Sequence, residues 1–182
     1  MIGAQEVGTQ GGKQTDVLRV EDLQTYFFLR RGVVKAVDGV SFTVRRGEVV
    51  GLVGESGCGK TITCLSIMQL VPRNGAKIIG GKVLFQGEDL LELTQNEMRH
   101  YRGRRIAMIM QDPQTSLNPV YTTGNQVAEP IRHHLGERGA AVMRKVLEAL
   151  RAVHIPAPEE REASTLISLA EACGRGLWRL WA

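Results

Sequence analysis

The sequence has 182 residues, of which 43% are hydrophobic and 23% charged. This composition is close to that of soluble globular proteins, and it excludes collagen, a coiled coil and wholesale disorder. The net charge of +4 comes from 23 Lys and Arg against 19 Asp and Glu, and the basic residues are scattered along the chain. The charge therefore does not indicate a protein that binds nucleic acid.

The cysteines and the apolar stretches indicate the compartment. Cys58, Cys64 and Cys173 cannot all pair and do not have metal-ligand spacing, which favours a reducing environment. No apolar stretch approaches the roughly 20 residues that a membrane-spanning helix needs. Residues 1–16 are polar and rich in glycine, without the apolar core of a secretion signal. We expect a cytoplasmic protein whose residues 1–16 form a disordered tail.

Strands are predicted in the first third of the chain. From Val17 on, LRVEDLQTYFF alternates apolar and polar side chains and VVKAVDGVSFTV follows it, which predicts two strands that end in a turn at Arg45, Arg46 and Gly47. The short apolar run GEVVGLVG fits a strand that is buried on both faces of a parallel sheet. The segment ITCLSIMQLV then has helical spacing and stops at Pro72.

The remaining elements alternate between strands and helices. GGKVLFQG predicts another strand, LTQNEMRHYRGR is compatible with a helix, and IAMIMQD predicts a second buried strand. A turn-rich link, DPQTSLNP, leads into two expected helices, from about Thr123 to Leu135 and from Ala140 to Val153.

The loop between the GEVVGLVG strand and the following helix matches G-x-x-x-x-G-K-[ST] at every fixed position. Glycines let successive backbone N–H groups point inward, and the start of the helix adds its positive dipole end, so the loop is suited to phosphate. Lys60 is expected to reach the β- and γ-phosphates, and the Thr61 hydroxyl to ligate Mg²⁺. The strand before the loop and the helix after it disfavour an accidental glycine-rich turn. The predicted nucleotide site comprises Gly54, Glu55, Ser56, Gly57, Cys58, Gly59, Lys60 and Thr61.

Three segments resemble the ATP-binding subunit of ABC transporters: AVDGVSFTVRRGEVVGLVGESGCGKT, GGKVLFQGEDLLEL and IAMIMQDPQTSLNPVYTTGNQVAEPI. QDPxTSLNP followed by TxGxQVxE is characteristic of the importers for oligopeptides, dipeptides and nickel. The resemblance runs from about Val17 to Arg161. It implies an α/β fold, a P-loop NTPase of the ABC type with an N-terminal antiparallel β part and the start of a helical subdomain. It divides the chain into residues 17–111 and 112–163.

The resemblance also implies roles for single residues. Lys60 and Gln111 are implied as catalytic residues. Gln111 would be the Q-loop glutamine, which contacts Mg²⁺ together with Thr61. The alternative is that Gln111 is an ordinary polar residue at the end of a strand. An aromatic residue should stack on adenine. Phe27 fits best by spacing and Tyr26 is the second candidate, while ordinary core packing of Phe27 is an equally open interpretation.

Further implications concern partners and location. The resemblance implies two transmembrane permease subunits, a second ATP-binding subunit and an extracytoplasmic substrate-binding protein, with this chain peripheral on the inner face of the plasma membrane. Residues 112–134 would contact the permease. His133 and His134 are adjacent, so on a helix they point about 100° apart and are expected to be surface residues rather than a shared metal site.

The resemblance ends near residue 163. No LSGGQ-like signature, Walker B strand ending in Asp-Glu or switch histidine follows Gln111. One choice of codons for residues 165–178, read one base earlier, translates as YPHQLSGGMRQRVM, which contains the family's signature. We infer an N-terminal fragment whose reading frame shifts near Ser164. Residues 164–182, with Cys173, Trp178 and Trp181, are then an out-of-frame tail.

These observations favour the ATP-binding subunit of an importer for peptides or nickel, which couples the binding and hydrolysis of MgATP to transport. One alternative is a non-functional remnant that retains at most nucleotide binding. A less favoured alternative is an unrelated P-loop kinase.

Overall fold

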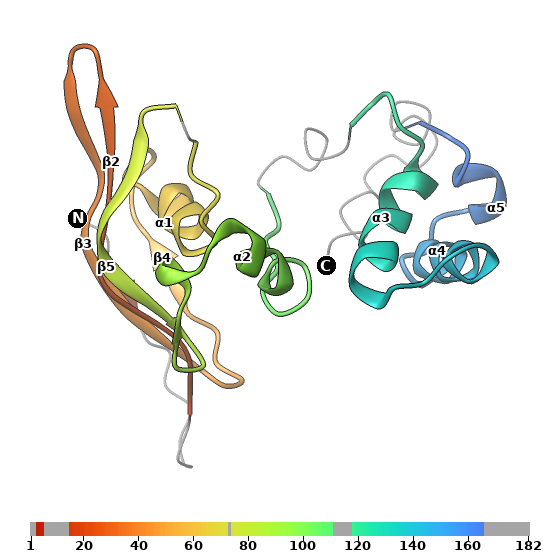
Figure 1. The fold of residues 1–182 in the computed structure, drawn as a ribbon, viewed down its shortest axis with the longest axis horizontal. Coiled ribbons are helices and arrows are strands. Elements are labelled where there is room, and N and C mark those ends of the chain that lie inside the picture. The colour runs from red at the N-terminus through yellow and green to blue at the C-terminus, as the bar shows by residue number, and fades with distance from the viewer. Residues whose placement is uncertain (1–2, 6–14, 73, 111–117, 166–182) are drawn as a thin grey trace. The chain divides into compact units, whose positions relative to one another are not determined.

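The computed structural model describes residues 3–5, 15–72, 74–110 and 118–165 (Figure 1). The chain divides into two compact units, Met1–Arg102 and Gly103–Ala182, and each is described by itself. Gln111, Cys173, Trp178 and Trp181 lie outside the described residues, as does most of the proposed out-of-frame tail.

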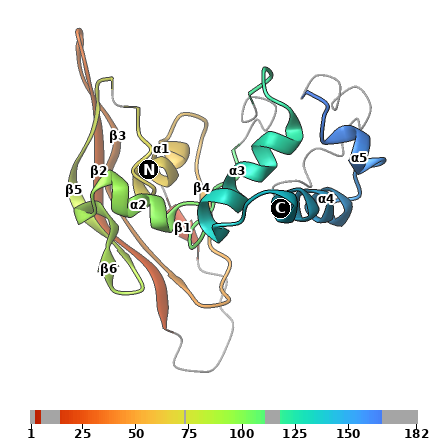
Figure 2. The ribbon, with the colours of Figure 1, turned by 45° about the vertical axis from the view of Figure 1, so that its right-hand side comes forward.

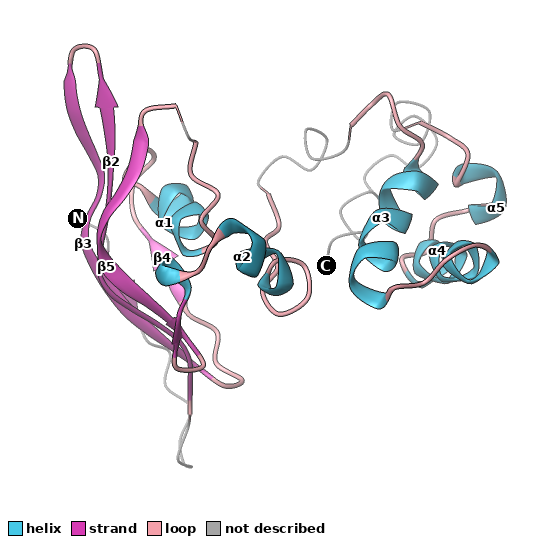
Figure 3. Cartoon of the chain, in the orientation of Figure 1, coloured by secondary structure: helices cyan, strands magenta, loops and turns pink. Residues whose placement is uncertain are grey.

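The first unit is built on an antiparallel sheet with the strand order β3-β2-β5-β6 (Figure 3). Its strands are β2 (Asp16–Leu29), β3 (Gly32–Arg45), β5 (Ala76–Phe85) and β6 (Glu88–Asp89). The strands predicted from the alternation in residues 17–45 and from GGKVLFQG are confirmed, because every second side chain can enter the core while its neighbours face water. The buried apolar residues of this unit include Val20, Leu23, Val37, Val83, Leu90 and Met98.

Two helices lie on the same side of this sheet (Figures 1 and 2). Helix α1 (Lys60–Ile67) confirms the helix predicted after the glycine-rich loop, and it buries Thr63, Ser66 and Ile67. A short 3-10 helix, η1 (Leu90–Glu92), precedes α2 (Gln95–Tyr101). Helix α2 confirms the helix expected in LTQNEMRHYRGR, and it buries Met98 and Tyr101.

The strand before the glycine-rich loop differs from the prediction. Only Gly51–Val53 form a strand, β4, and it pairs antiparallel with β1 (Gly3–Gln5) rather than parallel. Val49 is 85% exposed and Val53 is 54% exposed, so this run is not buried on both faces. An apolar run becomes a buried strand only where neighbouring strands flank it. In the described part of the chain, β4 has no neighbour other than β1, which comes from the expected tail.

The strand predicted for IAMIMQD is likewise not found. Residues 107–110 carry no regular secondary structure, and Ile109 and Met110 are 56% and 45% exposed. The prediction used local hydrophobicity alone, whereas strand formation needs a hydrogen-bonding partner from elsewhere in the chain. Among the described residues, no strand pairs with this segment.

The second unit contains α3 (Thr123–Leu135), α4 (Ala140–Ala152) and α5 (Pro158–Arg161). The first two confirm the helices predicted from residues 123 and 140. Their apolar faces share one core, formed by Ala128, Val142, Val146, Leu150 and Ile155. In neither unit does a described helix combine the length and the apolar character needed to cross a bilayer.

Candidate nucleotide-binding site

The loop between β4 and α1 is shaped by glycines. Gly57 and Gly59 have φ angles of 82° and 97°, in the region that favours glycine over every other residue. Gly59 is also the N-cap of α1, and it has no side chain to bond the first turn. The N–H groups that begin an α-helix have no partner within the helix. They can therefore donate to an anion held in the loop.

Lys60 crosses this loop. Its Nζ donates to the carbonyl oxygens of Gly54 and Glu55 at 2.7 and 2.6 Å, and it lies 3.4 Å from Cys58 Sγ. The ammonium group is thus held against the same backbone whose glycines turn the loop. Thr61 is the next residue and is exposed. A cation, a hydroxyl and a helix start therefore meet within eight residues, 54–61, which fits a phosphate group and its metal ion.

Buried hydroxyls connect α1 to its surroundings. Thr63 Oγ1 donates to Gly59 O at 3.0 Å, within the first turn of the helix. One turn further along, Ser66 Oγ lies 2.8 Å from Thr25 Oγ1 of β2. These contacts fix the helix relative to the sheet. The sequence does not predict the Thr25–Ser66 contact, because Thr and Ser at these positions belong to no recognisable motif.

The two aromatic candidates lie on opposite faces of β2. In the register with β5, Thr25, Tyr26 and Phe27 stand opposite Ile78, Lys77 and Ala76 in turn. The register with β3 shifts between Thr25 and Tyr26, but the extra residue lies in β3, so side chains along this stretch of β2 alternate between its faces. Thr25 contacts α1, and Phe27 shares its face. Phe27 is half-buried, and Tyr26 lies on the other face.

Tyr26 takes part in a surface network. Its hydroxyl donates to Asp38 Oδ1 at 2.5 Å, and Lys35 Nζ donates to Asp38 Oδ2 at 3.2 Å. Lys35 Nζ also lies 5.3 Å from the centroid of the Tyr26 ring. The hydrogen bonds from Tyr26 and Lys35 lower the pKa of the Asp38 carboxyl, and the bond to Asp38 raises the pKa of Tyr26. These contacts hold the Tyr26 side chain on the face of β2 that does not contact α1.

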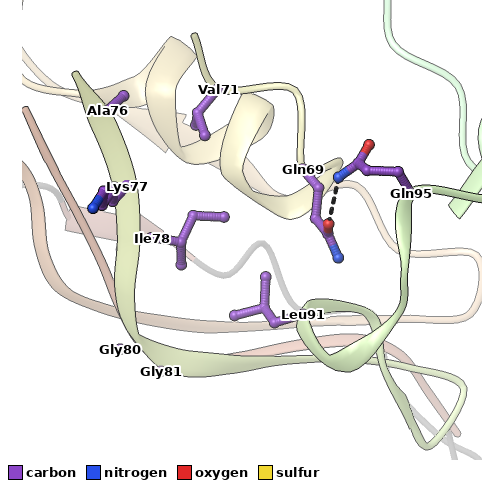
Figure 4. Close-up of a pocket in the computed structure, with 9 residues that line it drawn as sticks. All are labelled: Gln69, Val71, Ala76, Lys77, Ile78, Gly80, Gly81, Leu91 and Gln95. Atoms are coloured by element: carbon purple, nitrogen blue, oxygen red, sulfur yellow. Dashed lines mark hydrogen bonds between the residues drawn. The ribbon is translucent and has the colours of Figure 1, made fainter. Parts of the chain in front are cut away.

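A pocket of about 500 Å³ is lined by β5, the segment that follows α1, η1 and the start of α2 (Figure 4). Its apolar lining comes from Val71, Ala76, Ile78 and Leu91, and the amides of Gln69 and Gln95 are joined at 2.9 Å. The P-loop residues do not line it. The sequence does not predict this pocket, because its lining comes from four separate segments.

The histidine pair lies on α3, and the two described cysteines lie in the glycine-rich loop and on α1. The rings of His133 and His134 pack edge to face with centroids 4.9 Å apart. Within the described residues, no group of three His, Cys, Asp or Glu could hold a metal ion. Cys58 is half-buried in the loop, and burial raises the pKa of the Cys64 thiol on α1.

Residues 37–171 match a known family, described as ABC transporter. This chain belongs to the ABC transporter family. Over 145 residues it is 51% identical to the probable peptide ABC transporter ATP-binding protein y4tR of Sinorhizobium fredii. Over 145 residues it is 46% identical to the dipeptide transport ATP-binding protein DppD of Bacillus subtilis. Each alignment covers 80% of this chain, and the chain spans about 43% of either relative.

The fold agrees with this assignment. The solved structure of MJ0796, described as a bacterial ABC transporter cassette, matches with a TM-score of 0.68 at 20% identity. The match covers 90% of this chain and 68% of MJ0796. The predicted fold class, an ABC-type ATPase core, is confirmed. The two buried strands expected around GEVVGLVG and IAMIMQD are the exceptions: the first is reduced to β4, and residues 107–110 of the second form no strand.

Proposed function

We propose that this ABC transporter family member binds MgATP at residues 54–61 as part of the ATP-binding subunit of a peptide importer. One observation carries the proposal: Lys60 lies across a loop turned by Gly57 and Gly59, at the start of α1. The relatives y4tR and DppD are named ATP-binding proteins of peptide and dipeptide transport, which supports both the ligand and the substrate class.

The proposed roles of Lys60, Thr61 and Phe27 are supported by their positions, and that of Gln111, which lies outside the described residues, rests on the family resemblance. Lys60 binds the β- and γ-phosphates by exchanging its bonds to loop carbonyls for bonds to phosphate oxygens. Thr61 and Gln111 hold Mg²⁺, which supplies charge neutralisation when it is bound. Phe27, rather than Tyr26, stacks on adenine, because Phe27 shares the face of β2 that contacts α1.

The proposed partners are those of a membrane importer. The names of the relatives support peptides rather than nickel as the cargo, and a membrane permease as the partner that the ATP-binding subunit drives. The structure of MJ0796 is described as dimeric, which supports a second ATP-binding subunit as a further partner. The proposed location is the inner face of the plasma membrane, through the permease.

A titration of the full chain with a fluorescent adenine nucleotide and Mg²⁺ tests the proposal. We expect saturable binding that Lys60→Ala weakens by at least about tenfold, equal to about 1.4 kcal/mol. Lys82→Ala removes an exposed lysine from β5 and should leave the affinity unchanged. The proposal is wrong if well-folded chain shows no saturable binding, or if both variants behave like the unmodified chain.

A further inference from the structure

We propose that Thr25 and Ser66 are a pair of positioning residues that fix the strand carrying Phe27 relative to the helix carrying Lys60. The pair thereby sets how much the adenosine part of a nucleotide contributes to binding. This inference rests on the proposed function, because it concerns the same nucleotide site.

The geometry of the pair is specific. Both residues are 0% exposed, and their hydroxyl oxygens are 2.8 Å apart. Ser66 Oγ donates to Ile62 O of its own helix at 2.7 Å. A hydroxyl has one hydrogen, so the arrangement that satisfies both groups has Thr25 donating to Ser66. A strand hydroxyl is thus bonded, through a helix hydroxyl, to the backbone of α1.

The pair lies close to both parts of the proposed nucleotide site. Thr25 precedes Phe27 by two residues on the same face of β2, which is about 7 Å along a strand. Ser66 follows Lys60 by six residues within α1, which is about 9 Å along a helix. Each residue of the pair is joined to its partner in the site by regular secondary structure. A displacement of β2 relative to α1 at the pair therefore also displaces Phe27 relative to Lys60.

The chemistry of the contact explains why hydroxyls occur here. Apolar packing is not directional, so a sheet and a helix joined only by apolar side chains can slide by a fraction of an ångström. A hydrogen bond has a preferred length and angle, and breaking it in a buried site leaves two polar groups unsatisfied. The Thr25–Ser66 bond therefore selects one spacing of β2 and α1.

A purely structural pair would behave differently from a positioning pair. If the bond only stabilised the fold, its loss would lower the melting temperature and leave the selectivity of the site unchanged. If the bond positions Phe27, its loss reduces the affinity for ATP while the affinity for inorganic tripolyphosphate, which has no base, stays constant. The ratio of the two affinities separates these roles.

The test measures binding of Mg-tripolyphosphate and MgATP to the full chain by calorimetry. We expect Thr25→Val and Ser66→Ala each to reduce the ratio of ATP to tripolyphosphate affinity at least threefold. The double variant should reduce it no further than either single variant. Thr25→Ser keeps the hydroxyl and should keep the ratio. Val20→Ala, which opens a cavity elsewhere on β2, should lower the melting temperature only.

The outcomes are distinguishable. If the ratio of ATP to tripolyphosphate affinity is unchanged in folded Thr25→Val or Ser66→Ala, the inference is wrong and the proposed function stands. The same holds if Val20→Ala reduces this ratio as much as Thr25→Val and Ser66→Ala do. Absence of MgATP binding by the unmodified chain overturns the proposed function and this inference with it, whereas binding of MgATP without binding of Mg-tripolyphosphate overturns this inference alone. If Thr25→Val does not fold, Ser66→Ala and Thr25→Ser decide the result.

Discussion

At the scale of single residues, the site depends on backbone shape more than on side-chain chemistry. Gly57 and Gly59 allow φ angles that turn the chain, and Lys60 is then directed back over the turn. The G-x-x-x-x-G-K-[ST] spacing encodes both features locally, which is why the loop could be predicted from the sequence. The spacing favoured Phe27 over Tyr26 but did not show which of the two faces α1. Adjacent residues on a strand face opposite ways, and the contact between Thr25 and Ser66 shows which face of β2 meets α1.

Replacing Phe27 tests this difference. Phe27→Ala should weaken ATP binding by about 1–3 kcal/mol, the usual range for a base stacked on an aromatic side chain. Tyr26→Phe removes the hydroxyl bonded to Asp38 on the other face and should leave ATP affinity unchanged. Calorimetric titration of both variants is the measurement. A loss in Tyr26→Phe without one in Phe27→Ala would reverse the assignment of the adenine site.

At the scale of elements, helices were predicted better than strands. Helices α3 and α4 begin where their periodicity begins, because the hydrogen bonds of a helix are local. The segments around β4 and residues 107–110 are equally apolar, yet neither becomes a buried strand. Their pairing depends on residues distant in sequence, and local composition contains no information about those partners.

Helix α2 gives a prediction about pH. Thr94 and Glu97 form a capping box, in which each side chain bonds the backbone N–H of the other. Thr94→Ala should lower the free energy of unfolding by about 1 kcal/mol, the usual cost of losing such a cap. The bonds from Thr94 lower the pKa of the Glu97 carboxyl. Glu97 therefore stabilises α2 above its unfolded-state pKa, and this contribution is lost as pH falls through its folded-state pKa.

NMR titration of the Glu97 carboxyl measures this effect. In Thr94→Ala the pKa of Glu97 should rise toward its ordinary value, and the acid side of the stability curve should flatten. An unchanged Glu97 pKa in a folded variant would show that the cap is not formed in solution.

At the scale of the whole molecule, the described chain leaves part of its apolar surface uncovered. Val49, which precedes β4, and Val53, its last residue, are both largely exposed. Leu23 and Val83 of the antiparallel sheet are fully buried. The buried core of the first unit therefore lies at the antiparallel sheet and not at β4. Helices α3 and α4 have their own core in the second unit, so each unit has its own buried contacts.

Paired substitutions test this distribution. Val49→Lys should change the free energy of unfolding by less than about 0.5 kcal/mol, as is usual for an exposed site. Leu23→Ala should cost about 2–5 kcal/mol, because it leaves a cavity in the sheet's core. Chemical denaturation monitored by circular dichroism measures both. A large loss in Val49→Lys would mean that the apolar run that leads into β4 is buried, as the sequence first indicated.

The reading frame gives a prediction for the gene. We propose that a frameshift near Ser164 accounts for the change in sequence character after residue 163. DNA sequencing across this position and beyond should reveal, in the shifted frame, the LSGGMRQR signature followed by an apolar strand that ends in Asp-Glu. A shifted frame that soon reaches a stop codon would contradict the proposal.

The central claim is that the backbone of residues 54–61 binds the triphosphate of MgATP. Amide chemical shifts of the isotope-labelled full chain, recorded during a titration with MgATP, test it most directly. We predict that the amides of Gly57, Gly59, Lys60 and Thr61 shift saturably, and that folded Lys60→Ala needs at least about tenfold more MgATP to reach half of the full shift. Saturating MgATP that leaves these amides unmoved, or a Lys60→Ala variant that shifts at the same MgATP concentrations as the unmodified chain, would contradict the account.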